Sequence, residues 1–142
     1  MFTWVIAGSL VVGAPALKDE RKPVTPPAGE WVVERTESDG ARVTFCTRMY
    51  YRFTRTERRL TYNMIRPAVV TQRAAYYDTG GRLEVDFPAD PDGLQPERKG
   101  IWKVDGDTLT VCEGQTNGAR PIDFTAPKGS GRTLTVLKRV GD

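Results

Sequence analysis

The chain has 142 residues, with 21 Lys and Arg, 18 Asp and Glu, two Cys and no His, so its net charge is only +3. This length suits a single domain that buries a core without needing disulfides or metals. Because histidine is absent, the composition excludes Ser-His-Asp and Cys-His nucleophile systems and argues against catalytic zinc sites, which nearly always use an imidazole ligand. Fourteen Gly and ten Pro beside 39% hydrophobic residues favour short elements and many turns, as in an all-β chain.

Residues 1–16 are typical of a signal peptide. Residues 2–16 carry no charge, and their apolar run ends in Ala14-Pro15-Ala16, an A-x-A cleavage pattern that charged residues follow closely. The run is shorter than the roughly 20 residues needed to cross a bilayer. We therefore expect an exported protein, periplasmic or extracellular, that is cleaved after Ala16. An uncleaved N-terminal anchor and a wrongly assigned start codon are the alternatives.

Residues 17–28 form a charged segment that contains Pro23, Pro26 and Pro27. Proline lacks the N–H group that helix interiors and central strands need, so we expect a linker here with neither element. No transmembrane helix is expected in the mature chain.

Residues 29–140 show the period-two alternation of apolar and polar side chains that is typical of strands, and we expect them to form one folded domain. The expected strands are residues 30–37, 48–53, 59–64, 69–77, 82–87, 100–104, 108–111 and 133–136. Dipeptides that favour positive φ lie between them: Asp39-Gly40, Gly80-Gly81, Asp92-Gly93, Asp105-Gly106 and Asn117-Gly118. Asp105-Gly106 predicts a hairpin with a type I′ turn.

About eight short antiparallel strands with this punctuation form either a sandwich or a barrel. We favour an antiparallel up-and-down β-barrel, because closing the sheet removes its exposed edges. Such a barrel encloses a space that side chains fill or that holds one small ligand. Six large side chains are candidates to line it: Met49, Tyr51, Phe53, Tyr62, Met64 and Phe87. They suit a filled core and an apolar pocket equally well, so both interpretations stay open.

Two parts of the chain resemble known proteins. Gly29-Glu30-Trp31 looks like the GxW that opens lipocalins and related calycin barrels. The run from Gly100 to Cys112 (GIWKVDGDTLTVC), with Arg120-Pro121, Gly129-Ser130-Gly131 and the final LTVLKR, resembles an uncharacterised, mostly exported domain family expanded in Planctomycetes. The resemblance implies a lipocalin-like barrel and export. It implies no catalytic residue and no activity.

The lipocalin resemblance also implies a role for Trp31, which would close one end of the barrel and join its candidate lining. In lipocalins an arginine beyond the final strand packs across this tryptophan. Arg139 is the natural counterpart in this chain, and a cation-π contact with Trp31 would be structural.

The region from Arg48 to Arg73 is strongly basic. It contains seven arginines, Arg48, Arg52, Arg55, Arg58, Arg59, Arg66 and Arg73, against the single acid Glu57. Arginine binds anionic groups well, so Arg48, Arg52 and Arg59 are candidates to contact a cell-surface polymer, a lipid headgroup or an acidic protein. A merely solvated strand face is the alternative. No nucleic-acid partner is expected for an exported chain.

Cys46 and Cys112 are a candidate disulfide, which an oxidising compartment would permit, and two independent thiols are the alternative. The acidic segments at residues 90–93 and 105–107 lack the spacing of a calcium loop, and turn chemistry explains them. We therefore expect a monomeric, non-enzymatic binding protein with no metal and no cofactor. The leading hypothesis is a small apolar ligand inside the barrel. The alternative is a filled barrel that binds an anionic macromolecule through its arginines.

Overall fold

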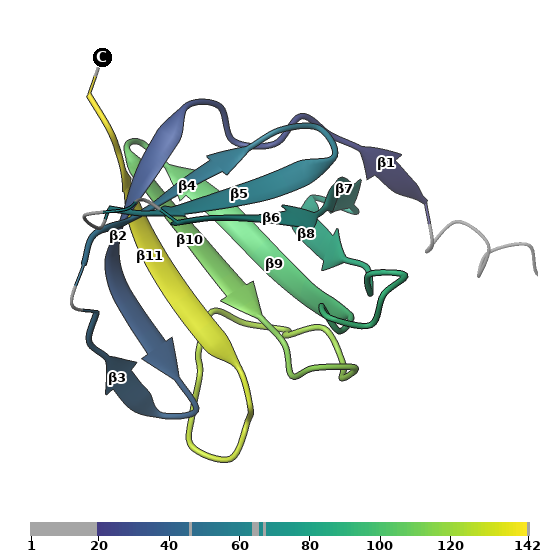
Figure 1. Cartoon of the computed structure of the whole chain (residues 1–142). Coiled ribbons are helices and arrows are strands. Elements are labelled where there is room, and N and C mark those ends of the chain that lie inside the picture. Colours follow the sequence, from purple (N-terminus) through teal and green to yellow (C-terminus); the bar gives the residue numbers. More distant parts are fainter. Residues whose placement is uncertain (1–19, 46, 64–65, 67, 142) are drawn as a thin grey trace, which may run out of the picture.

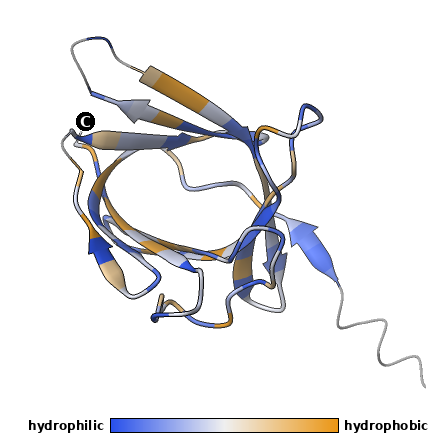
Figure 2. Ribbon diagram, turned by 60° about the horizontal axis from the view of Figure 1, so that its bottom comes forward, coloured by the Kyte–Doolittle hydropathy of each residue, from blue (hydrophilic) through white to orange (hydrophobic). Residues whose placement is uncertain are grey.

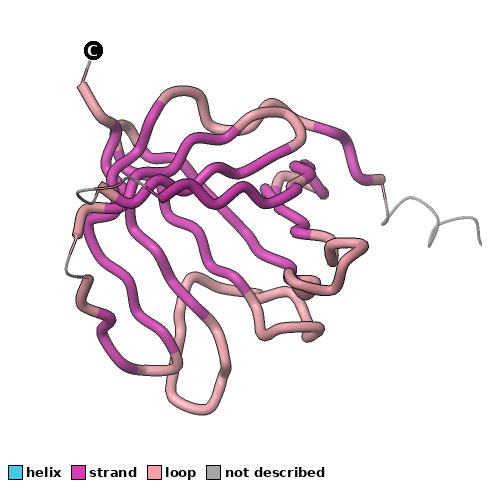
Figure 3. Tube along the Cα trace, viewed as in Figure 1, coloured by secondary structure: helices cyan, strands magenta, loops and turns pink. Residues whose placement is uncertain are grey.

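The computed structural model describes residues 20–45, 47–63, 66 and 68–141, and these residues form strands and loops without a helix (Figures 1 and 3). The predicted all-β class is therefore confirmed. The predicted signal peptide, residues 1–16, lies outside the described residues. The strands are β1 (Arg21–Pro23), β2 (Glu30–Ser38), β3 (Ala41–Val43), β4 (Met49–Phe53), β5 (Glu57–Tyr62), β6 (Ala68–Arg73), β7 (Ala75–Thr79), β8 (Arg82–Phe87), β9 (Arg98–Asp105), β10 (Thr108–Glu113) and β11 (Thr133–Arg139).

All strands belong to one antiparallel sheet with the order β1-β7-β8-β9-β10-β11-β2-β4-β5-β6, and β3 pairs with β2 off this path. Only Ala74 separates β6 from β7, although β6 pairs with β5 and β7 pairs with β8. One bent strand therefore joins the two ends of the path and completes the ring in Figure 2. Counting β6 and β7 together gives the predicted up-and-down barrel of about eight strands, to which β1 and β3 are added.

The hairpin turns follow the predicted glycines. Asp39-Gly40 and Gly80-Gly81 each link paired strands with two residues, and both residues of each turn have positive φ (49° and 82°, 61° and 90°), as type I′ turns require. In the β9–β10 hairpin, however, Asp105 pairs with Thr108, so Gly106-Asp107 are the central residues. Among these two only Gly106 has positive φ (61°), which matches type II′ and corrects the type I′ prediction.

The N-terminal segment departs from the linker predicted for residues 17–28. Arg21–Pro23 pair with β7, and the Val24 N–H donates to the Tyr76 carbonyl (3.1 Å). The prediction that no strand forms here is wrong for these three residues. The bend at Ala74 frees the outer edge of β7, and proline is tolerated in a strand at a sheet edge.

The core has two parts. The main cluster lies inside the barrel, and the apolar positions of Figure 2 alternate around the ring as expected for strands with one inward face. A second cluster lies outside β9, β10 and β11, under the loop of residues 114–132: Ile101, Cys112, Phe124, Ala126 and Leu134. Both faces of these three strands are thus covered.

Candidate functional site

The predicted lining residues fill the barrel interior. Four of them are at most 8% exposed: Met49, Tyr51, Phe53 and Phe87. Tyr62 is half-buried and packs against this core. Met64 lies outside the described residues. The period-two alternation therefore predicted the inward face of the sheet correctly for the five lining residues that the structure describes.

Aromatic rings stack edge to face through the interior. Ring centroids lie 6.1 Å apart for Tyr51 and Phe53, 6.2 Å for Phe53 and Tyr76, and 6.5 Å for Tyr76 and Trp102. The void beside this stack, which Pro27 helps to line, measures only about 10 Å³. Sites for small molecules usually enclose about 300–1,000 Å³. Among the residues that the structure describes, this void is too small for a ligand.

The two buried tyrosines of this stack keep their protons at neutral pH. Burial raises the pKa of Tyr51 to about 12, although the nearby charge of Arg58 opposes the rise. Burial also raises the pKa of Tyr76, whose hydroxyl donates to the Glu57 carbonyl (2.9 Å). Neither hydroxyl is therefore poised to act as a base.

Trp31 is fully buried, and the guanidinium carbon of Arg139 lies 4.3 Å from the centre of its ring. Arg139 also donates to the Ala28 carbonyl (3.0 Å) and lies 3.4 Å from Asp107. The contact expected between Trp31 and Arg139 is thus present. This contact joins the last residue of β11 to β2, and the hydrogen bond to Ala28 joins it to the segment that precedes β2.

An ion pair crosses the barrel interior between β5 and β10. Arg58 Nη1 and Nη2 donate to the two carboxylate oxygens of Glu113 at 2.8 and 3.1 Å, and Arg58 Nε donates to Gln72 Oε1 at 2.8 Å. Arg58 and Glu113 are each 3% exposed. The guanidinium group also lies 4.0 Å from the ring centre of Phe87 and 5.3 Å from that of Tyr51.

The two members of this pair keep each other charged. Burial alone would raise the pKa of Glu113, but the charge and hydrogen bonds of Arg58, together with the charge of Arg98, hold it below its ordinary value. Burial likewise disfavours the charged form of Arg58, and Glu113 outweighs that effect and raises its pKa. A bidentate pair of this kind is strongly coupled, because removing either member leaves a buried charge.

Arg58, one of the seven arginines of the basic region, is therefore buried and cannot contact a partner from the surface. Arg58, Leu60 and Tyr62 share one period-two face of β5, so the same alternation that placed Leu60 inward also places Arg58 inward. On β10, Leu109, Val111 and Glu113 likewise share the inward face. This inward polar pair was missed because charged residues are rarely buried.

The outer face of β4 and β5 carries Arg52 and Arg59, and Arg48 directly precedes β4; we call these three residues the arginine face. All three are exposed, and Arg52 lies directly opposite Arg59 in the antiparallel register. Glu30 on β2 lies 3.6 Å from Arg52. Within the described residues, no carboxylate lies within 4.0 Å of Arg48 or Arg59. Arg55, Arg66 and Arg73 are exposed as well, but Arg73 lies 3.7 Å from Asp90, which offsets its charge.

Cys112 is fully buried in the outer core cluster, with its Sγ 3.5 Å from the Thr125 carbonyl oxygen. Burial raises the pKa of its thiol to about 11. Cys46 lies outside the described residues, so the candidate disulfide stays a prediction. The structure does place Cys112 on the outward side of β10, opposite the inward Val111.

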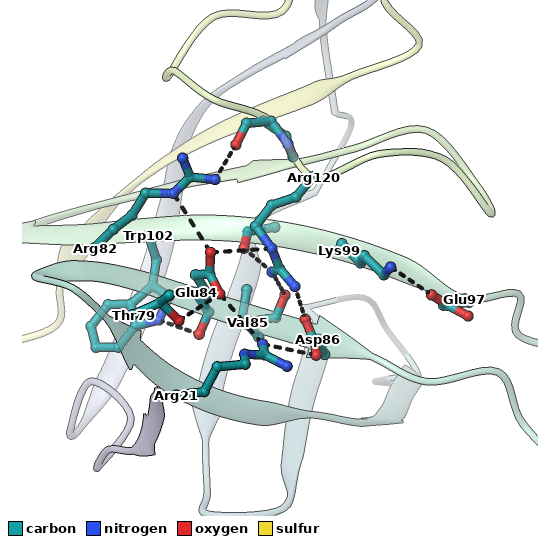
Figure 4. Close-up of polar contacts among 12 residues, drawn as sticks. Arg21, Thr79, Arg82, Glu84, Val85, Asp86, Glu97, Lys99, Trp102 and Arg120 are labelled. Carbon is teal, nitrogen blue, oxygen red and sulfur yellow. Dashed lines mark hydrogen bonds and ion pairs between the residues drawn. The ribbon is translucent and has the colours of Figure 1, made fainter. Parts of the chain in front are cut away.

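A second polar cluster, on the outer face of β8, has a structural role (Figure 4). Arg120 from the 114–132 loop donates to the Val85 and Gly100 carbonyls at 3.2 and 2.8 Å and lies 3.4 Å from Glu84. Arg21 of β1 lies 3.5 Å from the same Glu84. The cluster thus fixes both the N-terminal strand and the long loop to the barrel, which accounts for the Arg120-Pro121 motif.

Comparison with protein-family models, curated proteins and solved structures finds no match to this chain. In the part of the chain that the structure describes, no helix is long and apolar enough to cross a membrane. Inference about function therefore starts from two places in the fold: the packed interior with its buried ion pair, and the arginine face.

Proposed function

We propose that this protein is a non-enzymatic, exported binding module whose arginine face holds an anionic polymer, such as an acidic polysaccharide outside the cell. The observation that carries the proposal is the position of Arg52 directly opposite Arg59 on neighbouring strands. Like charges in directly opposite positions destabilise a sheet. Glu30 relieves Arg52, whereas Arg59 has no such acid within 4.0 Å among the described residues. An anionic partner that contacts both arginines would offset this repulsion.

The spacing of the charges supports a polymer rather than a single small anion. Neighbouring strands are about 4.8 Å apart, so the arginines of β4 and β5 present a closely spaced row of charges. A chain with an acidic group on each unit contacts several of them at once. Arginine is suited to this task because its planar guanidinium group binds carboxylates and similar anions through two hydrogen bonds.

The packed interior supports a surface site over an interior one. A small apolar ligand in the barrel, the other hypothesis from the sequence, would require the edge-to-face stack around Phe53 and Tyr76 to open. The ring of eight antiparallel strands and the contact of Arg139 with Trp31 support the proposed lipocalin-like relationship. Export rests on residues 1–16 of the sequence, and the monomeric state is proposed with it.

Heparin, a sulfated polysaccharide, provides a probe for this proposal. The variant with Arg48, Arg52 and Arg59 all replaced by Gln is expected to bind heparin at least about tenfold more weakly than the wild type at low salt, a loss of about 1.4 kcal/mol. The matched control replaces Lys22, Lys103 and Lys128 by Gln, which changes the net charge equally but leaves the arginine face intact. An equal loss in both variants would show that net charge alone drives binding and would overturn the proposal.

Native mass spectrometry of the full chain, purified without denaturant, tests the interior alternative. A filled barrel predicts the mass of the polypeptide alone and no response to lipophilic probes. A small molecule retained at fixed stoichiometry would favour the interior over the arginine face.

A further inference from the structure

A cavity of about 230 Å³ lies at the end of the barrel where β8 passes into the loop of residues 88–97. Gln72 and Arg98 bring polar atoms to its wall, and Phe87, Pro88 and Pro96 bring apolar surface. Three of these residues also contact the buried ion pair: Gln72 accepts from Arg58, Phe87 packs against the Arg58 guanidinium, and Arg98 lies 3.7 Å from Glu113. The cavity thus lies directly against the pair.

The charges around this cavity do not balance. Arg58 and Arg98 share the single carboxylate of Glu113, and Arg58 occupies both of its oxygens at hydrogen-bond distance. Arg98 is 3.7 Å away, beyond a hydrogen bond, and its side chain is 35% exposed. On the rim, Arg73 and Asp90 lie 3.7 Å apart and offset each other. One positive charge is therefore left over, on Arg98, beside a partly apolar hollow.

We propose that this cavity is a binding site for a small monocarboxylate with a short apolar body. The carboxylate would bind Arg98 as its second partner, and the body would lie against Phe87, Pro88 and Pro96. At about 230 Å³ the cavity is smaller than the roughly 300–1,000 Å³ usual for drug-sized ligands, which suits a molecule as small as benzoate. The Gln95 amide on the same wall offers further hydrogen bonds.

The charge count also sets the selectivity of the site. Only the positive charge of Arg98 is unbalanced, because Arg73 and Asp90 offset each other, so a second carboxylate on the ligand would be buried without a partner. A monocarboxylate is therefore favoured over a dicarboxylate of similar size. This site is separate from the arginine face and does not depend on the function proposed for that face.

Benzoate and its neutral analogue benzamide test the proposal. Nuclear magnetic resonance titration of the full chain is expected to show that benzoate shifts the side-chain amide signals of Gln72 and Gln95, with a Kd of about 1 mM, as is usual for so few ligand atoms. Benzamide is expected to shift them at least tenfold less at equal concentration. Equal shifts with benzoate and benzamide would overturn the assignment of a carboxylate site.

Variants of Arg98 complete the test. Arg98→Gln is expected to weaken benzoate binding at least tenfold, Arg98→Lys to restore part of it, and the control Arg35→Gln, on the exposed side of β2, to leave it unchanged. A dispersed wild-type-like spectrum establishes that each variant is folded. Unchanged benzoate binding by a folded Arg98→Gln variant would overturn the proposal.

Discussion

Replacement of Glu113 by Gln is expected to be among the most damaging single changes in the barrel. Glu113 is 3% exposed and accepts two hydrogen bonds from Arg58, which is equally buried. The amide cannot balance the guanidinium charge, and leaving one member of a buried pair uncompensated costs about 3–5 kcal/mol. Domains of this kind have a total stability of only about 5–15 kcal/mol. At about 4 °C per kcal/mol, the melting temperature would fall by about 12–20 °C.

Chemical denaturation and thermal unfolding of the wild type and Glu113→Gln measure this difference. The exposed pair of Arg52 and Glu30, 3.6 Å apart, provides the control, and Glu30→Gln is expected to change stability by less than about 1 kcal/mol. The double variant with Arg58→Met and Glu113→Leu removes both charges, and its stability should recover to about that of the wild type or above. If Glu113→Gln costs no more than Glu30→Gln, the pair is effectively solvated and the reasoning is wrong.

Three further predictions concern stability. The pKa of Glu113 in the folded protein is lowered below the unfolded value of about 4.3. Glu113 therefore stabilises the fold fully above that pH, and this stabilisation is lost as the pH falls through the folded pKa. Acid unfolding followed by circular dichroism should be less steep in Glu113→Gln than in the wild type. Arg139→Ala should lower stability by about 1 kcal/mol through loss of the contact with Trp31, while leaving heparin affinity unchanged; an unaltered melting temperature would contradict this role. Gly40→Ala should cost at least about 1 kcal/mol in denaturant titrations, since Gly40 has a φ of 82° and a Cβ there would lie 2.7 Å from the Lys128 backbone nitrogen; a neutral effect would show that this turn is not constrained.

The alternation of apolar and polar residues was sufficient to predict an all-β fold, because each strand must keep one face toward the core, and the removal of exposed edges favoured a barrel over a sandwich. It predicted one strand at residues 69–77, where the chain forms β6 and β7 on either side of Ala74. The bend at Ala74 closes the ring of strands. Closure depends on which distant strands pair, so no pattern in the neighbouring residues predicts the bend. Likewise, Arg21–Pro23 form a strand only because the bend exposes an edge of β7. The neighbouring prolines gave no indication of it.

The candidate site was predicted in part. Exposure of Arg48, Arg52 and Arg59 follows from their outward positions in the period-two pattern, and the structure adds that Arg52 and Arg59 lie opposite each other. The pairing of Arg58 with Glu113 could not be predicted, since the two residues are 55 positions apart and meet only across the closed barrel. The same holds for the cavity beside Arg98, which exists because the loop of residues 88–97 covers the end of the barrel.

The salt dependence of heparin binding tests the central claim most directly. If Arg48, Arg52 and Arg59 each contact one anionic group, each displaces about one counterion from the polymer, by analogy with phosphate contacts on nucleic acids. We expect the slope of log K against log salt concentration to become shallower by about three when the three arginines are replaced by Gln. The same slope should be unchanged in the control variant of Lys22, Lys103 and Lys128. Equal slopes in the wild type and the arginine variant would contradict the proposal that the arginine face is where the polymer binds.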